Sequence, residues 1–255
     1  MRRVVRGVIG FAGFLLVWEL FSRSGVVREE FLPPPTTVFA RLAVLLTEPP
    51  FVADVVATVL AWLIAVVIAS AIAVPLGLLL GSVPSVAAAS RALVEFLRPI
   101  PSVALIPLVI VLLGVGPETK ITLAVYASLW PLLFNTIYAM SEIDPVQVDT
   151  ARAFGLSRSR ILWTVQLPHA APFVMTGVRI SASIALILVI STELLAGGSG
   201  GLGQVIFDAG AGGGRMDIVL SATLVAGVIG FLGNAALEKV QRRWLGWDDQ
   251  IDAGR

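Results

Sequence analysis

The chain has 255 residues, of which 57% are hydrophobic and 14% are charged, and its mean hydropathy is +0.92. Because a soluble globular domain carries roughly a quarter charged residues, this composition excludes a soluble domain and indicates an all-α membrane protein. The net charge of +1 gives no indication of a nucleic-acid partner. The absence of cysteine and the single histidine argue against disulfides and against a thiolate or histidine metal site.

The first predicted span covers residues 7–22 and follows a basic start at Arg2, Arg3 and Arg6. A signal peptide begins in the same way, but no small-x-small cleavage site follows, so we expect a short membrane span. Residues 22–50 are polar and contain several prolines. Apolar residues at helical spacing from Thr36 to Leu46 predict a helix that lies along the outer membrane surface.

The rest of the chain predicts five more spans within a single transmembrane domain of residues 1–255. No charged residue occurs from Val55 to Ser90, which is longer than one span of about 20 residues. We expect a turn at 81–90, and we expect Arg98-Pro99-Ile100-Pro101 to break the third span. The predicted spans are 52–80, 86–113, 119–140, 170–196 and 216–237, with a glycine-rich outer connection at 197–214.

Basic residues orient these spans. With the N-terminus in the cytoplasm, twelve lysines and arginines lie on that side, and five lie outside. The twelve are Arg2, Arg3, Arg6, Arg91, Arg98, Arg152, Arg158, Arg160, Lys239, Arg242, Arg243 and Arg255; the five are Arg23, Arg28, Arg41, Lys120 and Arg215. The positive-inside rule therefore predicts that both termini and the connection at 142–168 are cytoplasmic.

The connection at 142–168 predicts two short helices joined by a glycine. Asp144 is suited to cap a helix whose first residue is Pro145, and Gly155 suits the left-handed position that ends it. Ser157 is suited to cap a second helix that runs to Leu167-Pro168. Such a hairpin between two spans predicts a docking surface for another protein; the alternative is an ordinary polar loop.

Asp149-Thr150-Ala151, Gly155 and Leu167-Pro168 resemble the EAA loop of ABC-importer permeases, although Asp149 and Thr150 replace Glu and Ala. Further stretches resemble the nitrate, sulfonate and taurine branch of that family. They are Arg98-Pro99-Ile100-Pro101, Ile106-Pro107-Leu108 through Gly114-Val115-Gly116, Glu193-Leu194-Leu195 through Gly200-Gly201-Leu202-Gly203, and Arg242-Arg243-Trp244-Leu245.

This resemblance implies the type I importer permease fold, with six transmembrane helices, in a bacterial plasma membrane. It implies a second copy of the chain, two cytoplasmic ATPase subunits that hold ATP and Mg, and an extracytoplasmic substrate-binding protein. The chain itself would bind no cofactor and catalyse no reaction, and it contains no phosphate-binding loop of the Gly-x-x-x-x-Gly-Lys-Ser/Thr type. A small anionic solute of the sulfonate, taurine or nitrate type would enter by alternating access.

The resemblance also implies that the hairpin inserts into a groove on the ATPase. The coupling residues that we predict are Asp149, Thr150, Ala151, Arg152, Ala153, Phe154, Gly155 and Leu156. Small residues at 151 and 153 allow close approach, while Phe154 could fill a pocket in the partner or pack on the permease itself. Arg152 could pair with an acidic rim of the ATPase.

Polar residues inside the spans are candidates for a translocation pathway or gate. Glu193 lies deep in span 170–196, where an ionised carboxylate costs roughly 2.5–3.5 kcal/mol. It could act in a gate or make a structural hydrogen bond to a neighbouring helix. Arg179 could attract an anionic solute or extend toward the membrane surface. The remaining candidates either line the pathway or bond across helices: Ser128, Asn135, Ser181 and Ser183.

Two other classes of function compete with a permease. Gly198-Ser199-Gly200 could hold the nucleophile of an intramembrane hydrolase, but this would need a basic partner in range, and the lone His169 lies on the cytoplasmic side of span 170–196 in the predicted topology. A transporter driven by an ion gradient is the other, but six spans without an obvious repeat or a cluster of membrane acids disfavour it.

Overall fold

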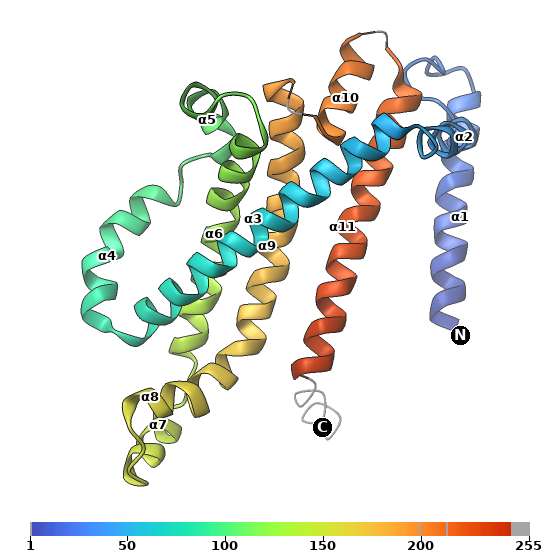
Figure 1. Cartoon of the computed structure of the whole chain (residues 1–255). Coiled ribbons are helices and arrows are strands. Elements are labelled where there is room, and N and C mark those ends of the chain that lie inside the picture. The colour runs from blue at the N-terminus through green and yellow to red at the C-terminus, as the bar shows by residue number, and fades with distance from the viewer. Residues whose placement is uncertain (1, 199, 213, 246–255) are drawn as a thin grey trace. The chain divides into compact units, whose positions relative to one another are not determined.

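The computed structural model describes residues 2–198, 200–212 and 214–245, and it contains helices and short connections without strands in these ranges (Figure 1). Bilayers favour this architecture because a helix satisfies its own backbone hydrogen bonds. The helices are α1 (Arg2–Arg23), α2 (Pro35–Leu45), α3 (Pro49–Ser82), α4 (Pro84–Leu97), η1 (Ser102–Leu105), α5 (Ile106–Leu113), α6 (Pro117–Ser141), α7 (Pro145–Ala153), α8 (Arg158–Ile161), the π-helical turn η2 (Leu162–Gln166), α9 (Leu167–Ala196), α10 (Leu202–Ala211) and α11 (Met216–Leu245).

Proline sets the start of several helices. α2, α3, α4, α6 and α7 each begin at a proline. Proline fits the first helical position because its fixed φ suits a helix and its missing N–H would have had no partner there. Pro84, for example, begins α4 directly after α3. The turn between these helices is therefore the single residue Val83 instead of the predicted 81–90.

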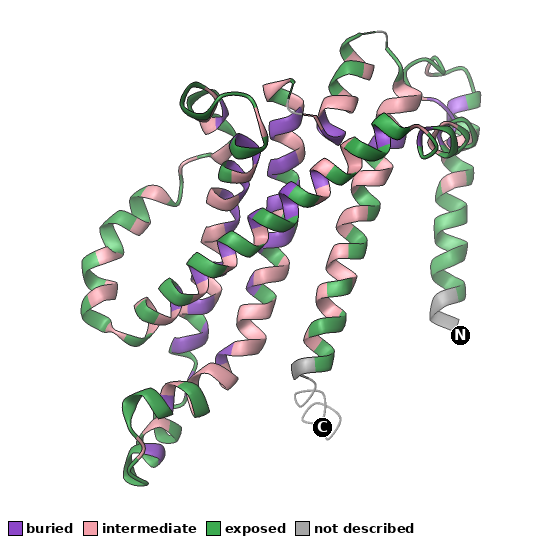
Figure 2. Ribbon diagram, viewed as in Figure 1, coloured by how far each residue is buried: buried purple, intermediate pink, exposed green. Residues whose placement is uncertain are grey.

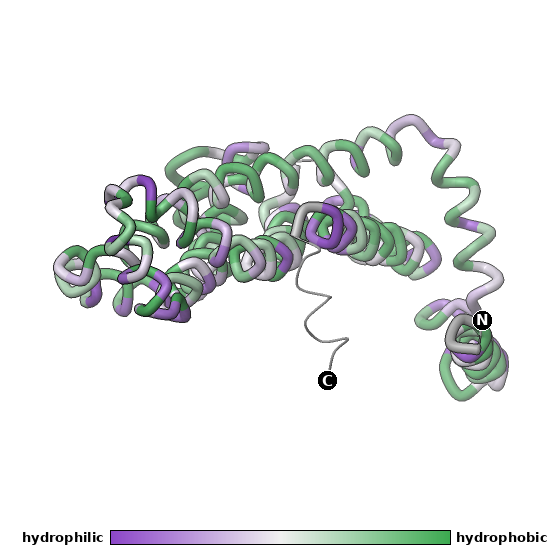
Figure 3. Tube along the Cα trace, turned by 90° about the horizontal axis from the view of Figure 1, so that it is seen from below, coloured by the Kyte–Doolittle hydropathy of each residue, from purple (hydrophilic) through white to green (hydrophobic). Residues whose placement is uncertain are grey.

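Length and hydropathy allow five helices of the described residues to cross a membrane, or six if a bent pair forms one span. The five are Val5–Arg23, Pro49–Ser82, Pro117–Ser141, Arg158–Ala196 and Met216–Arg243. The bent pair joins Pro84–Leu97 to Ser102–Leu113 at an angle of 75°, and the predicted break at Arg98-Pro99-Ile100-Pro101 lies at the bend. Apolar residues run along these long helices (Figure 3), and many of their large side chains are exposed (Figure 2).

One expectation about the later connections was wrong, and another was incomplete. The second helix of the hairpin does not end at Leu167-Pro168, because α8, η2 and α9 form one helical run from Arg158 to Ala196. Pro168 removes one backbone donor, and the wider π-helical turn just before it relieves the clash between its ring and the preceding turn. The glycine-rich connection at 197–214 also contains α10, whose Leu202 and Gly203 are buried.

The chain forms two compact units, and residues 1–59 and 193–229 make up the first. Leu45, Phe51, Leu202 and Ala222 form its buried apolar cluster. The Ser221 hydroxyl, which is fully buried, donates to the Val38 carbonyl of the surface-type helix α2 at 2.9 Å. This unit thus holds α2 and α10 against the ends of longer helices.

The second unit comprises residues 60–192 and 230–255, and small residues bring its helices close together. Gly77 and Gly81 are four residues apart on α3 and face Thr136 and Met140 of α6. Such small-xxx-small spacing is a common helix contact in membranes because it lets two backbones approach. Trp62 donates its indole N–H to the Ala182 carbonyl at 2.7 Å, and Gly233 of α11 leaves room for the Trp62 ring.

The close contact of α3 with α6 predicts the effect of adding a methyl group there. A Cβ atom on Gly77 would lie 2.5 Å from Thr136 Cβ, and one on Gly81 would lie 2.5 Å from Met140 Cβ. We expect Gly77→Ala and Gly81→Ala to cost about 1–3 kcal/mol each by overpacking, and to lower the melting temperature of the purified protein. Gly227→Ala is the matched control, since nothing lies within 4 Å of a Cβ at that helical position. Equal melting temperatures for all three variants would contradict this packing.

Candidate functional site

The hairpin begins with the predicted cap. The Asp144 carboxylate accepts a hydrogen bond from the Val146 N–H at 2.9 Å, and Pro145 occupies the first position of α7. A side-chain cap of this kind stabilises a helix by about 0.5–2 kcal/mol because it satisfies a backbone donor that the helix leaves free. The start of α7 is therefore fixed by the sequence of the hairpin itself.

The turn at Gly155 is a Schellman motif. The Leu156 N–H donates to the Ala151 carbonyl at 3.1 Å, and the Gly155 N–H donates to the Arg152 carbonyl at 2.8 Å. Gly155 has a φ of +78°, as predicted from its position after the helix. A residue with a Cβ would be strained there by roughly 1–2 kcal/mol. This turn fixes the direction in which the chain leaves α7.

The second arm of the hairpin is continuous with a membrane span. The Ser157 hydroxyl caps α8 by accepting from the Arg160 N–H at 3.4 Å. From Arg158 the helix runs through the π-helical turn into α9. No loop separates the hairpin from α9, so a displacement of the hairpin would be passed directly to that helix.

The root of the hairpin is packed, whereas its tip is exposed. A buried cluster of Ala139, Met140, Ile143 and Ala170 joins α6, the hairpin and α9, and Ile161 of α8 is 3% exposed. By contrast, Phe154 at the tip is 81% exposed. Val146 and Trp163 are exposed as well, and most of α7 and α8 is exposed in Figure 2. Apolar side chains that protrude from a polar hairpin are typical of a contact surface for a partner.

The predicted coupling residues divide between these two environments. Phe154 does not pack on the described part of the chain, and Thr150 and Ala153 are exposed beside it. Ala151, in contrast, is buried within the hairpin. Arg152 pairs with Asp149 at 3.0 Å, and because both side chains are more than 60% exposed this pair is worth little. Arg152 therefore remains available to a stronger partner.

Glu193 closes a buried hydrogen-bond network at the start of α10. Its carboxylate accepts from the Thr58 hydroxyl at 2.9 Å and from the Gly203 N–H at 3.1 Å. Thr58 accepts in turn from the Leu202 N–H at 2.9 Å, and Asp54 accepts from the Gly201 N–H at 2.7 Å. Glu193 and Thr58 are fully buried. Three consecutive backbone donors at the N-terminus of α10 are thus satisfied by side chains of α3 and α9.

Gly201 is required by this arrangement. Its φ is +113°, and a Cβ at this position would collide with the Glu193 carboxylate. The close approach of backbone to carboxylate explains why the chain has a glycine here. Glu193 thus makes structural hydrogen bonds within a helix cap, while its role in a gate stays a prediction.

Arg179 lies in a polar contact between α9 and α11. Its guanidinium donates to the side chains of Asn234 at 3.1 Å and Gln241 at 3.3 Å, and it lies 3.7 Å from the Glu238 carboxylate. The Arg179 side chain is 30% exposed. Arg179 therefore joins two helices instead of simply extending toward the membrane surface.

The smaller polar candidates donate hydrogen bonds to backbone carbonyls of the helices. Ser181 donates to the Ser128 carbonyl at 2.6 Å and thereby joins α9 to α6, and both residues are buried. The Ser128 hydroxyl and the Asn135 amide donate to carbonyls four residues earlier in α6. Ser183 bonds within α9 and is exposed. Ser183 is thus the serine of this set that is free to face a pathway.

Several residues of these networks do not stand out in the sequence. Thr58 and Glu193 are 135 residues apart, and Arg179 and Asn234 are 55 residues apart. Of the residues that the sequence analysis missed, which are Asp54, Thr58 and Asn234, Asp54 has a recognisable signal, since it is an acid just before a long uncharged stretch. Ser199 and Arg255, which entered the sequence arguments above, lie outside the described residues.

A family model described as "Binding-protein-dependent transport system inner membrane component" matches residues 73–246 of the chain, which include the hairpin and the helices on both sides of it. The chain belongs to this family. The predicted family is confirmed, and the permease is a component of a transport system and not an enzyme.

Relatives cover almost the whole permease. The taurine transport system permease protein TauC of Escherichia coli is 28% identical over 98% of this chain and 92% of its own length. The bicarbonate transport system permease protein CmpB of Synechococcus elongatus is 31% identical over 92% of this chain and 87% of its own length. These relatives agree with the predicted branch of the family.

The fold is similar to that of a solved transporter. A chain of the MetNI methionine ABC transporter, solved in inward-facing conformations, matches with a TM-score of 0.67 and 22% identity over 75% of this chain and 94% of that chain. The predicted all-α permease fold is therefore confirmed. The permease is an integral multi-pass membrane protein and the permease subunit of an ABC importer, a class that works with ATPase partners.

The cap of α10 predicts how Glu193 contributes to stability. Glu193→Ala leaves the Thr58 hydroxyl and the Gly203 N–H without this acceptor, and each buried unpaired group costs about 1–3 kcal/mol. We expect a lower melting temperature and faster tryptic cleavage after Arg215, just beyond α10. Glu193→Gln keeps one acceptor oxygen and should lie between Glu193→Ala and the native protein.

Thr192→Val provides the control for this experiment. Thr192 is about as buried and is adjacent in sequence, but among the described residues its hydroxyl bonds to the Leu188 carbonyl of its own helix alone. Its replacement should leave cleavage after Arg215 unchanged. If Glu193→Ala and Thr192→Val were cleaved at the same rate, Glu193 would not be the cap of α10.

Proposed function

We propose that two copies of this permease form the transmembrane part of a bacterial plasma-membrane importer. In this proposal two cytoplasmic ATPase subunits, which carry ATP and Mg, bind the hairpin at 142–168, and an extracytoplasmic binding protein delivers the solute. The permease itself binds no cofactor. It moves a small anionic solute of the sulfonate, taurine or nitrate type into the cytoplasm by alternating access.

The observation that carries the ATPase contact is the exposed Phe154 on a hydrogen-bonded turn. An aromatic side chain that is 81% exposed on a polar hairpin loses contact with water if it enters a pocket of a partner. The Schellman turn fixes the backbone at Phe154, so little backbone conformational entropy is lost on binding. Asp149, Thr150, Arg152 and Ala153 surround it on the exposed side of α7.

The packed root provides the route for mechanical coupling. A pull on the tip acts on α8 and, through the continuous helix, on α9, which bonds to α6 through Ser181 and to α11 through Arg179. Buried contacts of this kind change between discrete arrangements instead of deforming smoothly. We infer that ATP-driven closure of the ATPases shifts α9 relative to its neighbours and changes access to the pathway.

The orientation of the permease follows from its charges. The excess of lysine and arginine on the side of the hairpin supports a cytoplasmic location for the hairpin and both termini. Only in this orientation is the hairpin accessible to an ATPase that uses cytoplasmic ATP. α10, which lies within the predicted outer connection at 197–214, then faces the binding protein.

The solute class is inferred from the relatives. Taurine carries a sulfonate and bicarbonate is an anion, so the names of these two relatives share an anionic group. In such systems the binding protein largely sets selectivity. Binding measurements on that protein, with a panel of sulfonates, nitrate and bicarbonate, are therefore the direct test of the solute class.

Replacing Phe154 tests the proposed coupling. Phe154→Ala should reduce both ATPase binding and solute uptake, because truncating a central aromatic residue of an interface typically costs 2 kcal/mol or more, about 30-fold in affinity. Membrane abundance should stay normal, since the side chain is exposed in the permease. The measurements are uptake in membrane vesicles and retention of the ATPase during purification.

Phe231→Ala is the matched control, because Phe231 is a comparably exposed phenylalanine on α11 and lies outside the hairpin. Its uptake and ATPase retention should equal those of the native permease. Normal ATPase retention by Phe154→Ala would refute the proposed role of the hairpin tip.

A further inference from the structure

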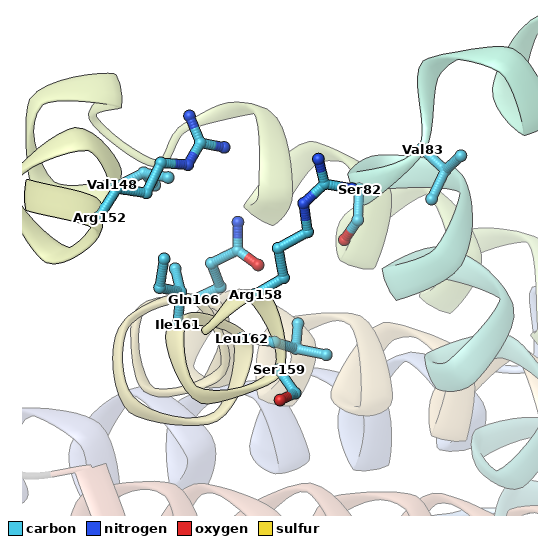
Figure 4. A pocket seen from close by; sticks show the side chains of 9 residues that line it. All are labelled: Ser82, Val83, Val148, Arg152, Arg158, Ser159, Ile161, Leu162 and Gln166. Atoms are coloured by element: carbon cyan, nitrogen blue, oxygen red, sulfur yellow. The ribbon is translucent and has the colours of Figure 1, made fainter. Parts of the chain in front are cut away.

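A pocket of about 370 Å³ lies in the second unit, between the end of α3 and the hairpin. Figure 4 shows the Arg152, Arg158 and Gln166 side chains directed toward a shared space, with the Ser82 hydroxyl close to Arg158. The pocket is within the size range of small-ligand sites. Its polar groups come from three different elements, α3, α7 and the run from α8 to η2.

The charge of this pocket is positive. Among the described residues that line it, none is acidic, whereas two are arginines. Arg152 forms an ion pair with Asp149, which does not line the pocket. That pair is exposed and therefore weak. Two guanidinium groups in one pocket repel each other, and an anion between them would remove that repulsion. The planar guanidinium fork suits a phosphate in particular.

The pocket is also partly apolar. Its lining includes Val83, Val148, Ile161 and Leu162. An apolar stripe leads away from it along α3, where exposed side chains recur every three or four residues at Ile68, Ile72, Leu76 and Leu79. The next step of the same spacing is Ser82, at the pocket itself. The ligand should therefore have an anionic head and an apolar tail.

We propose that this pocket binds the head group of an anionic phospholipid, with the phosphate between Arg152 and Arg158 and an acyl chain along the stripe on α3. Ser82 is the last residue of a long apolar span, so the pocket lies at the level of lipid head groups. The assignment to the cytoplasmic leaflet rests on the orientation given under Proposed function. The pocket and its ligand class do not depend on the ATPase.

The test uses the purified full-length permease and dioctanoyl-phosphatidylglycerol, with bound lipid counted by native mass spectrometry. We expect one tightly bound lipid on the native protein. Arg158→Gln should weaken its binding at least tenfold. Arg160→Gln is the matched control, because Arg160 is an exposed arginine of the same short helix that does not line the pocket; it should bind like the native protein.

Two further probes distinguish the chemistry of the ligand. Dioctanoyl-phosphatidylcholine, which has no net charge, should bind at least tenfold more weakly, and inorganic phosphate should compete only at much higher concentration. Equal effects of Arg158→Gln and Arg160→Gln would overturn the proposal, as would equal binding of the two lipids. Inorganic phosphate that competes as well as the lipid would make this a site for free anions.

A fourth outcome would assign the pocket to a protein. If the addition of the ATPase subunit displaced the lipid, the two arginines would serve an acidic surface of that partner, and the lipid proposal would be wrong. Because lipid binding is measured first without ATPase, its failure can be distinguished from failure of the coupling proposal, which Phe154→Ala tests by uptake.

Discussion

The structure depends on one constraint, which is that polar groups within a bilayer must find partners inside the protein. Several buried polar side chains of this permease follow it, whereas the buried indole N–H groups of Trp18 and Trp130 have no hydrogen-bond partner among the described residues. Trp62 donates to a carbonyl of α9, Ser181 donates to a carbonyl of α6, and Glu193, Thr58 and Asp54 satisfy the first backbone donors of α10. Two glycines make close contacts possible. Gly201 leaves room for the Glu193 carboxylate, and Gly77 lets the backbones of α3 and α6 approach. These polar residues inside the spans therefore make structural contacts, and a role for any of them in a pathway or gate stays a prediction.

The hairpin at 142–168 satisfies its polar backbone groups in a different way from the buried helices. Its caps and its Schellman turn satisfy the backbone locally, so it keeps its shape without being buried. Its root is packed on α6 and α9, and its second arm continues into α9. A segment that is rigid, exposed and joined directly to a span is suited to convert a contact with a partner into movement of a membrane helix. We propose the apolar tip at Phe154 as a surface for a protein and the positive pocket as a surface for a lipid, and Arg152 borders both.

Local features of the fold could be predicted from the sequence, and contacts between distant residues could not. Asp144, Pro145, Gly155 and Ser157 act within a few residues of themselves, so their types were enough to predict the caps and the turn. The break at Arg98-Pro99-Ile100-Pro101 was predictable for the same reason. The network around Glu193 was not, because it joins residues 135 apart, and the helix α10 was hidden in a glycine-rich stretch whose start is stabilised by those distant side chains. Pro168 led to a wrong prediction of a helix end, because the π-helical turn before it accommodates the proline within a continuous helix. The coupling role of the hairpin tip and the residues that line a pathway remain predictions.

The central claim is that the hairpin tip faces the cytoplasm and touches an ATPase. Since the chain has no cysteine, Phe154→Cys creates a single thiol that can carry a short photoactivatable cross-linker. The measurement is cross-linking in membranes that contain the assembled transporter, with Phe231→Cys as the reference position. We expect an adduct with the ATPase subunit from position 154 and none from position 231. Labelling of Cys at position 154 by a membrane-impermeant thiol reagent added outside intact cells, or the absence of any ATPase adduct, would contradict the account.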